Sequence, residues 1–469
     1  MSAGSLTPMS TEKAAAETRD YGRSAGLLTL ALGSAGVLIY AFFALASHTL
    51  DSDEYGQIVV LWSIVFVVGA TLFRPIEQLL SRSLAEHEQL GEGTGHVLRV
   101  AAVIQGGLAM LALLLLLALR EPIEDNLLGG GDVLFWVLVG ALVGFGAAYY
   151  ARGFLAGRRQ FGLYSVLLMI EGVARLVFAL AVAVGIAEGE DVVALGIALA
   201  PFAGLVVMPF ALRAKRPDPR SAPAELASAD GVAAEPEFSL SHGGAFAAAV
   251  LLMMLSEQVM VSSGALFVRA AEGAAAAGYI FNVLMVARAP LVLFQAVAAS
   301  LLPHLTRLRA RGDATGGDAF RLSVNTTLMT IAGFAALTTV GVLAVGPQAM
   351  QLAFGDKFEY DRLGLAIVAV GMGFYLCGAA LNQAALAQGQ ARRAAVCWVT
   401  CAVAFIVFNL IAPLDPYRTV EVGFAGSAAL LSGLLALVYL RPHARAGDAL
   451  EPGSARELEA RLAAADEIG

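Results

Sequence analysis

Twelve long apolar runs divide this chain, and they limit its possible folds more than any other feature of the sequence. A helix rises about 1.5 Å per residue, so roughly 20 residues cross a hydrocarbon core of about 30 Å, and each run approaches that length. Because 58% of the residues are hydrophobic and only 14% are charged, a soluble core could not enclose this apolar surface. We therefore expect an all-α integral membrane protein with about twelve transmembrane helices. The predicted spans are residues 24–47, 57–80, 97–119, 133–150, 164–186, 192–212, 243–268, 277–302, 322–345, 364–386, 394–411 and 422–440.

Basic residues separate the two faces of the predicted bundle. When alternate connections are assigned to opposite faces, most of the 30 Lys and Arg residues lie on the side of the N-terminus. Cytoplasmic connections are enriched in Lys and Arg, so both termini are expected in the cytoplasm of a protein of the bacterial inner membrane. The opposite connections are short and acidic. Their few basic residues are Arg120, Arg269, Lys357, Arg362 and Arg418.

A polar stretch rich in Pro, Ala and acidic residues follows the sixth predicted span and reads as a flexible linker between two lobes. Tyr55-Gly56 opens the second span, Gly278-Tyr279 opens the eighth, and both spans continue past an Arg and a Pro. This repeat predicts two six-helix lobes related by a pseudo-two-fold axis along the membrane normal. The expected organisation is a cytoplasmic tail at 1–23, an N-lobe at 24–212, a cytoplasmic linker at 213–240, a C-lobe at 241–440 and a cytoplasmic tail at 441–469.

Two ionisable side chains are expected near the bilayer midplane, where burying a charge is costly and therefore points to function. Glu257 and Arg288 each lie about eleven residues from the predicted outer boundary of neighbouring antiparallel spans. They could form a structural ion pair. Alternatively, an anion would bind Arg288 while a proton or cation binds Glu257, a reading that the polar neighbours Gln258 and Asn282 favour slightly.

Two further groups of charged residues fall within predicted spans. Glu171 and Arg175 are four residues apart, so they can neutralise each other on one helix face, and a structural role is favoured. Arg74 lies near the cytoplasmic end of its span, where snorkelling to the interface competes with a role in a cavity. The candidates for substrate binding are Arg288, Arg175, Arg74, Asn282 and Gln258, and those for ion coupling are Glu257 and Glu171.

The segment Arg152-Gly-Phe-Leu-Ala-Gly-Arg-Arg-Gln-Phe-Gly-Leu-Tyr164, followed by Glu171-Gly-Val-Ala-Arg175, resembles the fourth-to-fifth helix connection of bacterial polysaccharide transporters. Asp53-Glu54-Tyr55-Gly56 and Phe73-Arg74-Pro75-Ile76-Glu77 resemble two further motifs of the same family. These transporters are O-antigen and exopolysaccharide flippases of the multidrug, oligosaccharidyl-lipid and polysaccharide exporter superfamily. The resemblance implies twelve helices in two lobes around a cationic cavity, and alternating access. It also implies a polyprenyl-diphosphate-linked oligosaccharide as cargo, contact with membrane lipids, and polysaccharide polymerase machinery as a candidate partner.

A flippase for a lipid-linked oligosaccharide used in cell-surface polysaccharide synthesis is therefore the leading hypothesis. Arginines would hold the diphosphate through charge-assisted hydrogen bonds, and the neutral polar residues would meet the sugar hydroxyls. The alternative is a drug or metabolite exporter of the same superfamily, coupled to Na⁺ or H⁺. Arginine at the midplane argues against cationic drugs as its cargo.

An enzymatic role is the least favoured hypothesis. The Asp51-Ser-Asp53-Glu54 loop superficially fits a membrane glycosyltransferase that uses a polyprenyl-phosphate sugar, but such an enzyme needs larger outer loops than this sequence offers. Cys377, Cys397 and Cys401 lie within apolar runs and predict neither a disulfide framework nor a metal site. We expect no cofactor and no nucleic-acid partner.

Overall fold

The structure is a computed structural model, and it describes residues 31–213 and 240–440 except for 32, 91–92, 287 and 289–313. All regular elements in these ranges are helices. The predicted cytoplasmic tails, nearly all of the predicted linker and parts of the first and eighth predicted spans lie outside the described residues.

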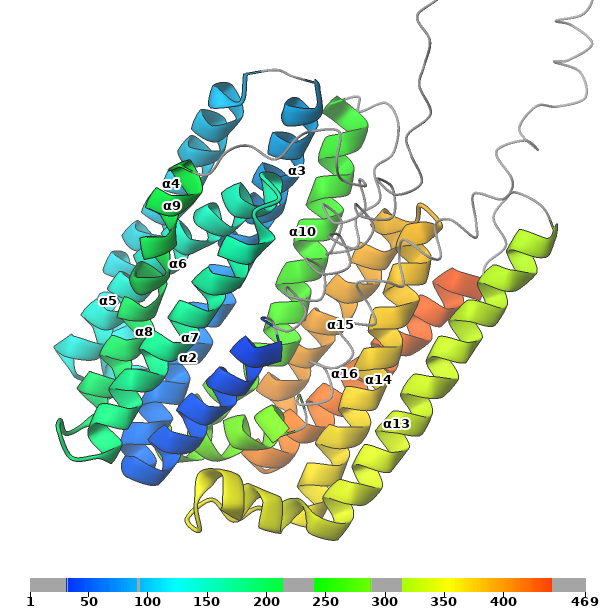
Figure 1. The fold of residues 1–469 in the computed structure, drawn as a ribbon. Helices are drawn as coiled ribbons and strands as arrows, with labels where there is room; N and C mark the ends of the chain where they lie inside the picture. The colour runs from blue at the N-terminus through cyan, green and yellow to red at the C-terminus, as the bar shows by residue number, and fades with distance from the viewer. Residues whose placement is uncertain are drawn as a thin grey trace, which may run out of the picture.

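The helices of the first half follow one another closely (Figure 1). They are Gly33–Thr49, α2 (Ser52–Leu72), α3 (Arg74–Leu90), α4 (Gly95–Ala118), α5 (Arg120–Asn126), α6 (Asp132–Gly157), α7 (Phe161–Ala183), α8 (Glu190–Gly204), the 3₁₀ turn η1 (Leu205–Val207) and α9 (Met208–Arg213). The helices of the second half are α10 (Leu240–Ser262), α11 (Gly264–Glu272), Ala274–Val286, α13 (Ala314–Phe354), α14 (Arg362–Ala387), α15 (Ala391–Ile411) and α16 (Pro416–Leu440).

Nine helices of the described part are long and apolar enough to cross a membrane. A tenth candidate is the bent pair Ala248–Ser262 and Gly264–Glu272, and Gly33–Thr49 and Ala274–Val286 are two shorter apolar helices. Each of the twelve predicted spans overlaps one of these elements. The expected all-α membrane fold is therefore confirmed.

Helix packing divides the described residues into two groups (Figure 1). In the first, α6 packs against α2, α3, α4 and α8, and α7 packs against α8. In the second, α14 packs against α13 and α16, and α15 packs against α10 and α16. The fourth predicted span forms α6 and the tenth forms α14, and each of these two helices packs against several others of its own group. Their equivalence, six spans apart, fits a repeat of six helices. We call these groups the N-lobe and the C-lobe.

The seventh span differs from the straight helix that its apolar run predicts, because it bends by 43° between α10 and α11. Ser263 lies at the bend, and its hydroxyl donates to the carbonyl of Val259, 2.5 Å away. A Ser hydroxyl that bonds back to the preceding turn, followed by Gly264, is a known cause of helix kinks.

The lobes meet where α2 crosses the helix Ala274–Val286, at a pair of glycines. A side chain at Gly56 would overlap the backbone carbonyl of Ala274. A Cβ atom at Gly278 would lie 2.9 Å from the ring of Tyr55 and 3.6 Å from the Cα atom of Gly56. The two segments that the sequence marks as a repeat, Tyr55-Gly56 and Gly278-Tyr279, therefore contact each other.

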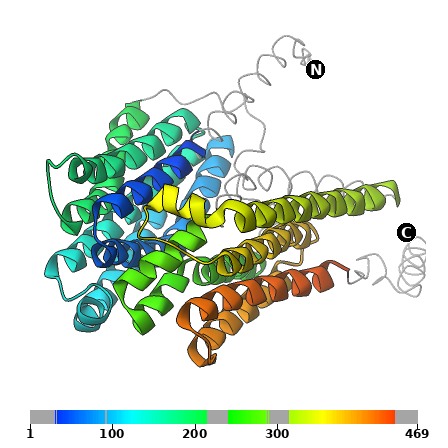
Figure 2. The same ribbon diagram turned by 90° about the horizontal axis from the view of Figure 1, so that it is seen from below.

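The short acidic connections gather at one end of the bundle, which we call the acidic end and define by residues 50–54, 120–132, 184–191, 355–361 and 412–418. Viewed from below, the segment after α13 lies between the lobes, beside the N-terminal helix (Figure 2). Several hydrogen bonds join the lobes here. Arg269 Nε donates to the carbonyl of Leu127 at 3.1 Å, and the amide of Ala275 donates to Asp53 Oδ1 at 3.3 Å. The lobes are thus closed against each other at the acidic end.

Candidate functional site

Glu257 of α10 lies in the C-lobe beside an aromatic pair. Its Oε1 accepts a hydrogen bond of 2.6 Å from the hydroxyl of Tyr375 on α14. The Tyr375 ring packs edge-on against Trp398 of α15, with ring centres 6.0 Å apart. The indole nitrogen of Trp398 in turn donates to Asn382 Oδ1 at 3.1 Å. A buried tyrosine held on both sides therefore positions the carboxylate.

Two guanidinium groups approach Tyr375 from different helices. The charges of Arg288 and Arg74 both act on the hydroxyl of Tyr375. Arg288 also lies within electrostatic reach of Tyr40, whose hydroxyl donates to the carbonyl of Met285 at 2.5 Å. The sequence repeat thus has a spatial counterpart, because each Arg precedes the Pro of the second or eighth span and both lie near the same hydroxyl.

Arg288 does not pair with Glu257 as the sequence suggested. No hydrogen bond or ion pair joins Arg288 to a residue that the structure describes. The hydrogen bond that Glu257 accepts comes from Tyr375 instead. A guanidinium carries five N–H donors and stays charged at all physiological pH values. Arg288 therefore has donors to offer to an anion.

The N-lobe contains a second buried polar group. Arg152 of α6 forms an ion pair with Glu171 Oε2 of α7, and both side chains are nearly enclosed. Arg175, one turn along α7, is 4% exposed and lies with its guanidinium 4.7 Å from the centre of the Trp62 ring. The Nε atom of Arg175 has no hydrogen-bond partner in the described part of the chain.

The expected neutralisation of Glu171 by Arg175 is therefore only electrostatic, and Arg152 makes the contact. The two arginines share one carboxylate. Glu77 of α3 lies nearby and accepts a hydrogen bond of 2.9 Å from the hydroxyl of Tyr164. Its neighbour Arg74 acts electrostatically on Tyr149 of α6 and on Tyr375, so it faces the protein interior.

The two neutral candidates lie elsewhere in the lobe interface. Asn282 is fully buried, and its side-chain oxygen accepts a hydrogen bond from Tyr55 of α2, close to the glycine crossing. Gln258 Oε1 accepts a hydrogen bond of 3.4 Å from Ser262 within its own helix. The side-chain oxygens of both residues therefore already accept a hydrogen bond from a hydroxyl group.

Sequence reasoning singled out neither Tyr375 nor Trp62, and Arg152 entered only as the first residue of a family motif. Tyrosine and tryptophan inside an apolar run carry no charge signal. Arg152 falls just past the predicted span 133–150, although α6 continues to Gly157. A test for Arg in the turn after a predicted span would have found it.

The charged residues of these two polar groups are unequal in number. Four arginines, at 74, 152, 175 and 288, accompany three glutamates, at 77, 171 and 257. In the residues that the structure describes, no group of three or more His, Cys, Asp or Glu side chains could hold a metal ion. The arrangement therefore suits an anion between the lobes and a titratable carboxylate beside it.

No family model matches the chain, and no curated protein matches it. Solved structures do match. An inward-facing multidrug resistance MATE family transporter of the MOP superfamily superposes with a TM-score of 0.64 at 12% identity, over 88% of this chain and 96% of the other. The eukaryotic MATE transporter AtDTX14 gives 0.61 at 14% identity, over 91% and 96%. A mutant of the Vibrio cholerae MATE transporter VcmN gives 0.56 at 17% identity, over 90% and 97%. The chain has the two-lobe fold of these transporters.

Proposed function

We propose that this chain is an alternating-access exporter of the drug or metabolite class, that its cargo carries negative charge, and that Glu257 couples transport to H⁺ or Na⁺. The fold supports the transport part, because the named neighbours are MATE transporters and one of them is called a multidrug resistance transporter. The single observation that carries the choice of cargo is Arg288, a half-buried guanidinium in the field of Tyr40 and Tyr375 that makes no hydrogen bond or ion pair with a described residue.

The closed acidic end supports a resting state that opens at the opposite end. The inward-facing neighbour superposes with a TM-score of 0.64, and an outward-facing MATE transporter of the MOP superfamily with 0.57. If the termini are cytoplasmic, as the distribution of Lys and Arg predicts, this conformation admits cargo from the cytoplasm. Closure at the opposite end and separation at the acidic end would then release it outside.

Glu257 is the favoured coupling residue because its carboxylate lies beside the proposed anion site. Tyr375 connects the two, since it donates to Glu257 and lies in the field of Arg288. Glu171 is the weaker candidate because Arg152 already neutralises it. A proton or cation that binds Glu257 would change the net charge beside Arg288 and hence the affinity for the cargo.

A lipid-linked oligosaccharide flippase is the second candidate, and the N-lobe favours it. Arg74 and Arg175 add guanidinium groups to Arg288, and a diphosphate needs several such donors. The motifs around Arg152 and Arg74 also resemble those of polysaccharide transporters. Lipid-linked cargo and a polysaccharide polymerase as partner belong to this candidate, whereas an inner-membrane location is proposed for both candidates.

Transport by purified protein in proteoliposomes tests the proposal. Three probes are compared under imposed pH and Na⁺ gradients: an amphipathic fluorescent organic anion, ethidium as an organic cation, and a labelled polyprenyl-diphosphate oligosaccharide. We expect uptake of the organic anion and its loss in Arg288→Gln. Transport of ethidium alone would overturn the anionic cargo, and transport of the oligosaccharide alone would establish the second candidate.

A further inference from the structure

The segment 355–361, which we call the strap, connects α13 to α14 at the acidic end. Gly355 ends α13 with a positive φ of 95°, a backbone conformation that glycine adopts readily. Asp361 begins α14 as its N-cap, and its side chain accepts a hydrogen bond of 3.1 Å from the amide of Gly364. The strap therefore has a defined start and a defined end.

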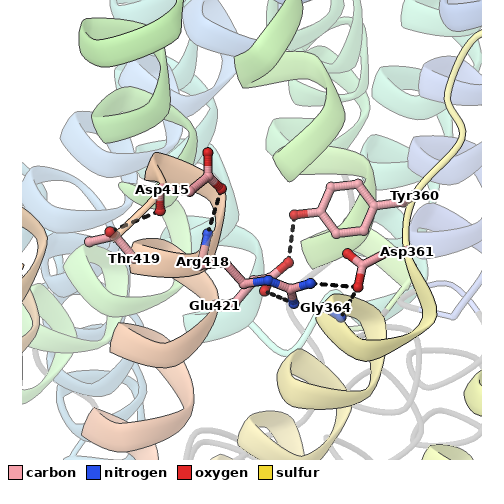
Figure 3. Close-up of polar contacts among 7 residues, drawn as sticks. All are labelled: Tyr360, Asp361, Gly364, Asp415, Arg418, Thr419 and Glu421. Carbon is pink, nitrogen blue, oxygen red and sulfur yellow. Dashed lines mark hydrogen bonds and ion pairs between the residues drawn. The ribbon is translucent and has the colours of Figure 1, made fainter. Parts of the chain in front are cut away.

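The C-terminal end of the strap is fixed to α16 of the C-lobe (Figure 3). Glu421 is fully buried, and its Oε1 accepts a hydrogen bond of 2.6 Å from Tyr360. Arg418 forms ion pairs with both carboxylates, at 2.8 Å to Glu421 Oε2 and at 2.6 Å to Asp361 Oδ2. Any side chain at Gly364 would overlap the Glu421 carboxylate, so glycine makes the room for this network.

The middle of the strap is held by the lobe interface instead. Phe358 is fully buried between Tyr55 of α2 and Tyr279, with ring centres 5.1 Å and 4.9 Å from its own. The ammonium group of Lys357 donates to the carbonyl of Leu50 in the N-lobe, and the hydroxyl of Tyr279 donates to the carbonyl of Lys357. Leu50 directly follows the helix Gly33–Thr49, and a positive charge is favourable at that end of a helix.

We propose that the strap is the latch of the acidic end: its Tyr360–Asp361 root belongs permanently to the C-lobe, whereas Lys357 and Phe358 engage the N-lobe only when the lobes are closed. This inference rests on the alternating-access function proposed above. Tyr55 and Tyr279 come from the two repeated segments, so one ring, Phe358, fills the space between equivalent positions of the two lobes. Opening requires Phe358 to leave Tyr55 and Lys357 to release Leu50, whereas the contacts of Glu421 persist.

A distance measurement tests the latch without any cargo. Spin labels are attached to cysteines at Asp125 and Leu414, which are exposed at the acidic end of the N-lobe and the C-lobe, after the three native cysteines are replaced by alanine. Double electron–electron resonance on the full chain then reports the populations of closed and separated lobes. Phe358→Ala removes two aromatic contacts with its neighbours, and we expect the ratio of separated to closed molecules to rise about tenfold.

Two further variants make the result specific. Lys357→Met keeps the apolar stem of the side chain but removes the bond to Leu50, and the ratio should rise about threefold. Phe135→Ala removes a fully buried ring inside the N-lobe, near the same end, and should leave the ratio unchanged. Unchanged populations in both strap variants, or an equal rise in Phe135→Ala, would overturn the proposal.

A cross-linking arm connects the latch to transport. Cysteines at Leu50 and Lys357 are joined by a short bismaleimide, which should stop uptake of the organic anion in proteoliposomes while leaving both lobes folded. Undiminished transport by the cross-linked protein would show that the strap need not open. If the unmodified protein transports none of the three probes, the proposed function fails, but the distance measurement still decides the latch.

Discussion

The acidic end and the candidate site both contain arginines and glutamates, but they differ in how completely the hydrogen bonds of these side chains are made. At the acidic end both oxygens of Glu421 accept hydrogen bonds, and Arg418 joins two carboxylates. In the candidate site Arg288 makes no hydrogen bond with a described residue, and the Nε atom of Arg175 is enclosed without one. A satisfied charge stabilises the fold in which it is satisfied, whereas an unsatisfied one has binding capacity left for a ligand. The difference separates a structural network from a candidate binding site.

Glu421→Ala should give the largest effect on stability. It removes the buried acceptor of Tyr360 and one partner of Arg418, and we expect a loss of about 3 kcal/mol in the free energy of unfolding. Thermal unfolding in detergent measures this loss. Glu421→Gln keeps the shape of the side chain and should lose less. If Arg288→Ala destabilised the protein as much as Glu421→Ala does, the contrast between the two regions would disappear.

Arg288→Ala should give the largest effect on transport with little effect on stability. A hydrogen bond to a charged group contributes about 1.5–3 kcal/mol, so uptake of the organic anion should fall roughly 10- to 100-fold. Arg288→Lys keeps the charge but not the planar fork of donors and should retain intermediate transport. Unfolding temperatures of all three proteins should agree. Equal transport by Lys and Arg would show that charge alone suffices.

Glu257→Gln should remove the dependence of transport on the pH gradient. The amide oxygen of Gln can still accept the hydrogen bond from Tyr375, so the local structure should persist. An imposed pH gradient should speed uptake in the unmodified protein and should make no difference to uptake by the variant. Glu171→Gln provides the comparison in the N-lobe. Loss of the gradient's effect in that variant alone would reassign coupling to Glu171.

Asp361→Asn should give the smallest effect. Partial burial raises the pKa of Asp361, but the hydrogen bond and charge of Arg418 and the hydrogen bond from the amide of Gly364 together outweigh it and hold the pKa below its ordinary value. Such a group stabilises the folded state above its unfolded pKa of about 3.9, and this stability is lost as the pH falls through the lower folded pKa. Half the side chain is exposed, so the contribution should stay under about 1 kcal/mol. Unfolding temperatures between pH 3 and 6 should therefore decline slightly less in the D361N variant than in the unmodified chain.

The all-α membrane fold and the places of its apolar helices could be predicted from the sequence, because a helix that crosses a membrane needs a minimum apolar length. The contacts between side chains could not, because they depend on which helices become neighbours. Glu257 has Tyr375 as its partner from a helix more than a hundred positions away, and Glu171 has Arg152. The bend at Ser263 has a local signal in the sequence, Ser262-Ser263-Gly264, but a prediction from the length of the apolar run alone misses it.

Gly56 and Gly278 bring the two lobes together backbone against backbone. Most interfaces can absorb a small displacement, since their side chains change rotamers and fill the space that opens. Two glycines have no such side chains, so this contact is either complete or lost. We therefore expect few stable intermediates between joined and parted lobes, and a switch between two discrete shapes in place of gradual opening.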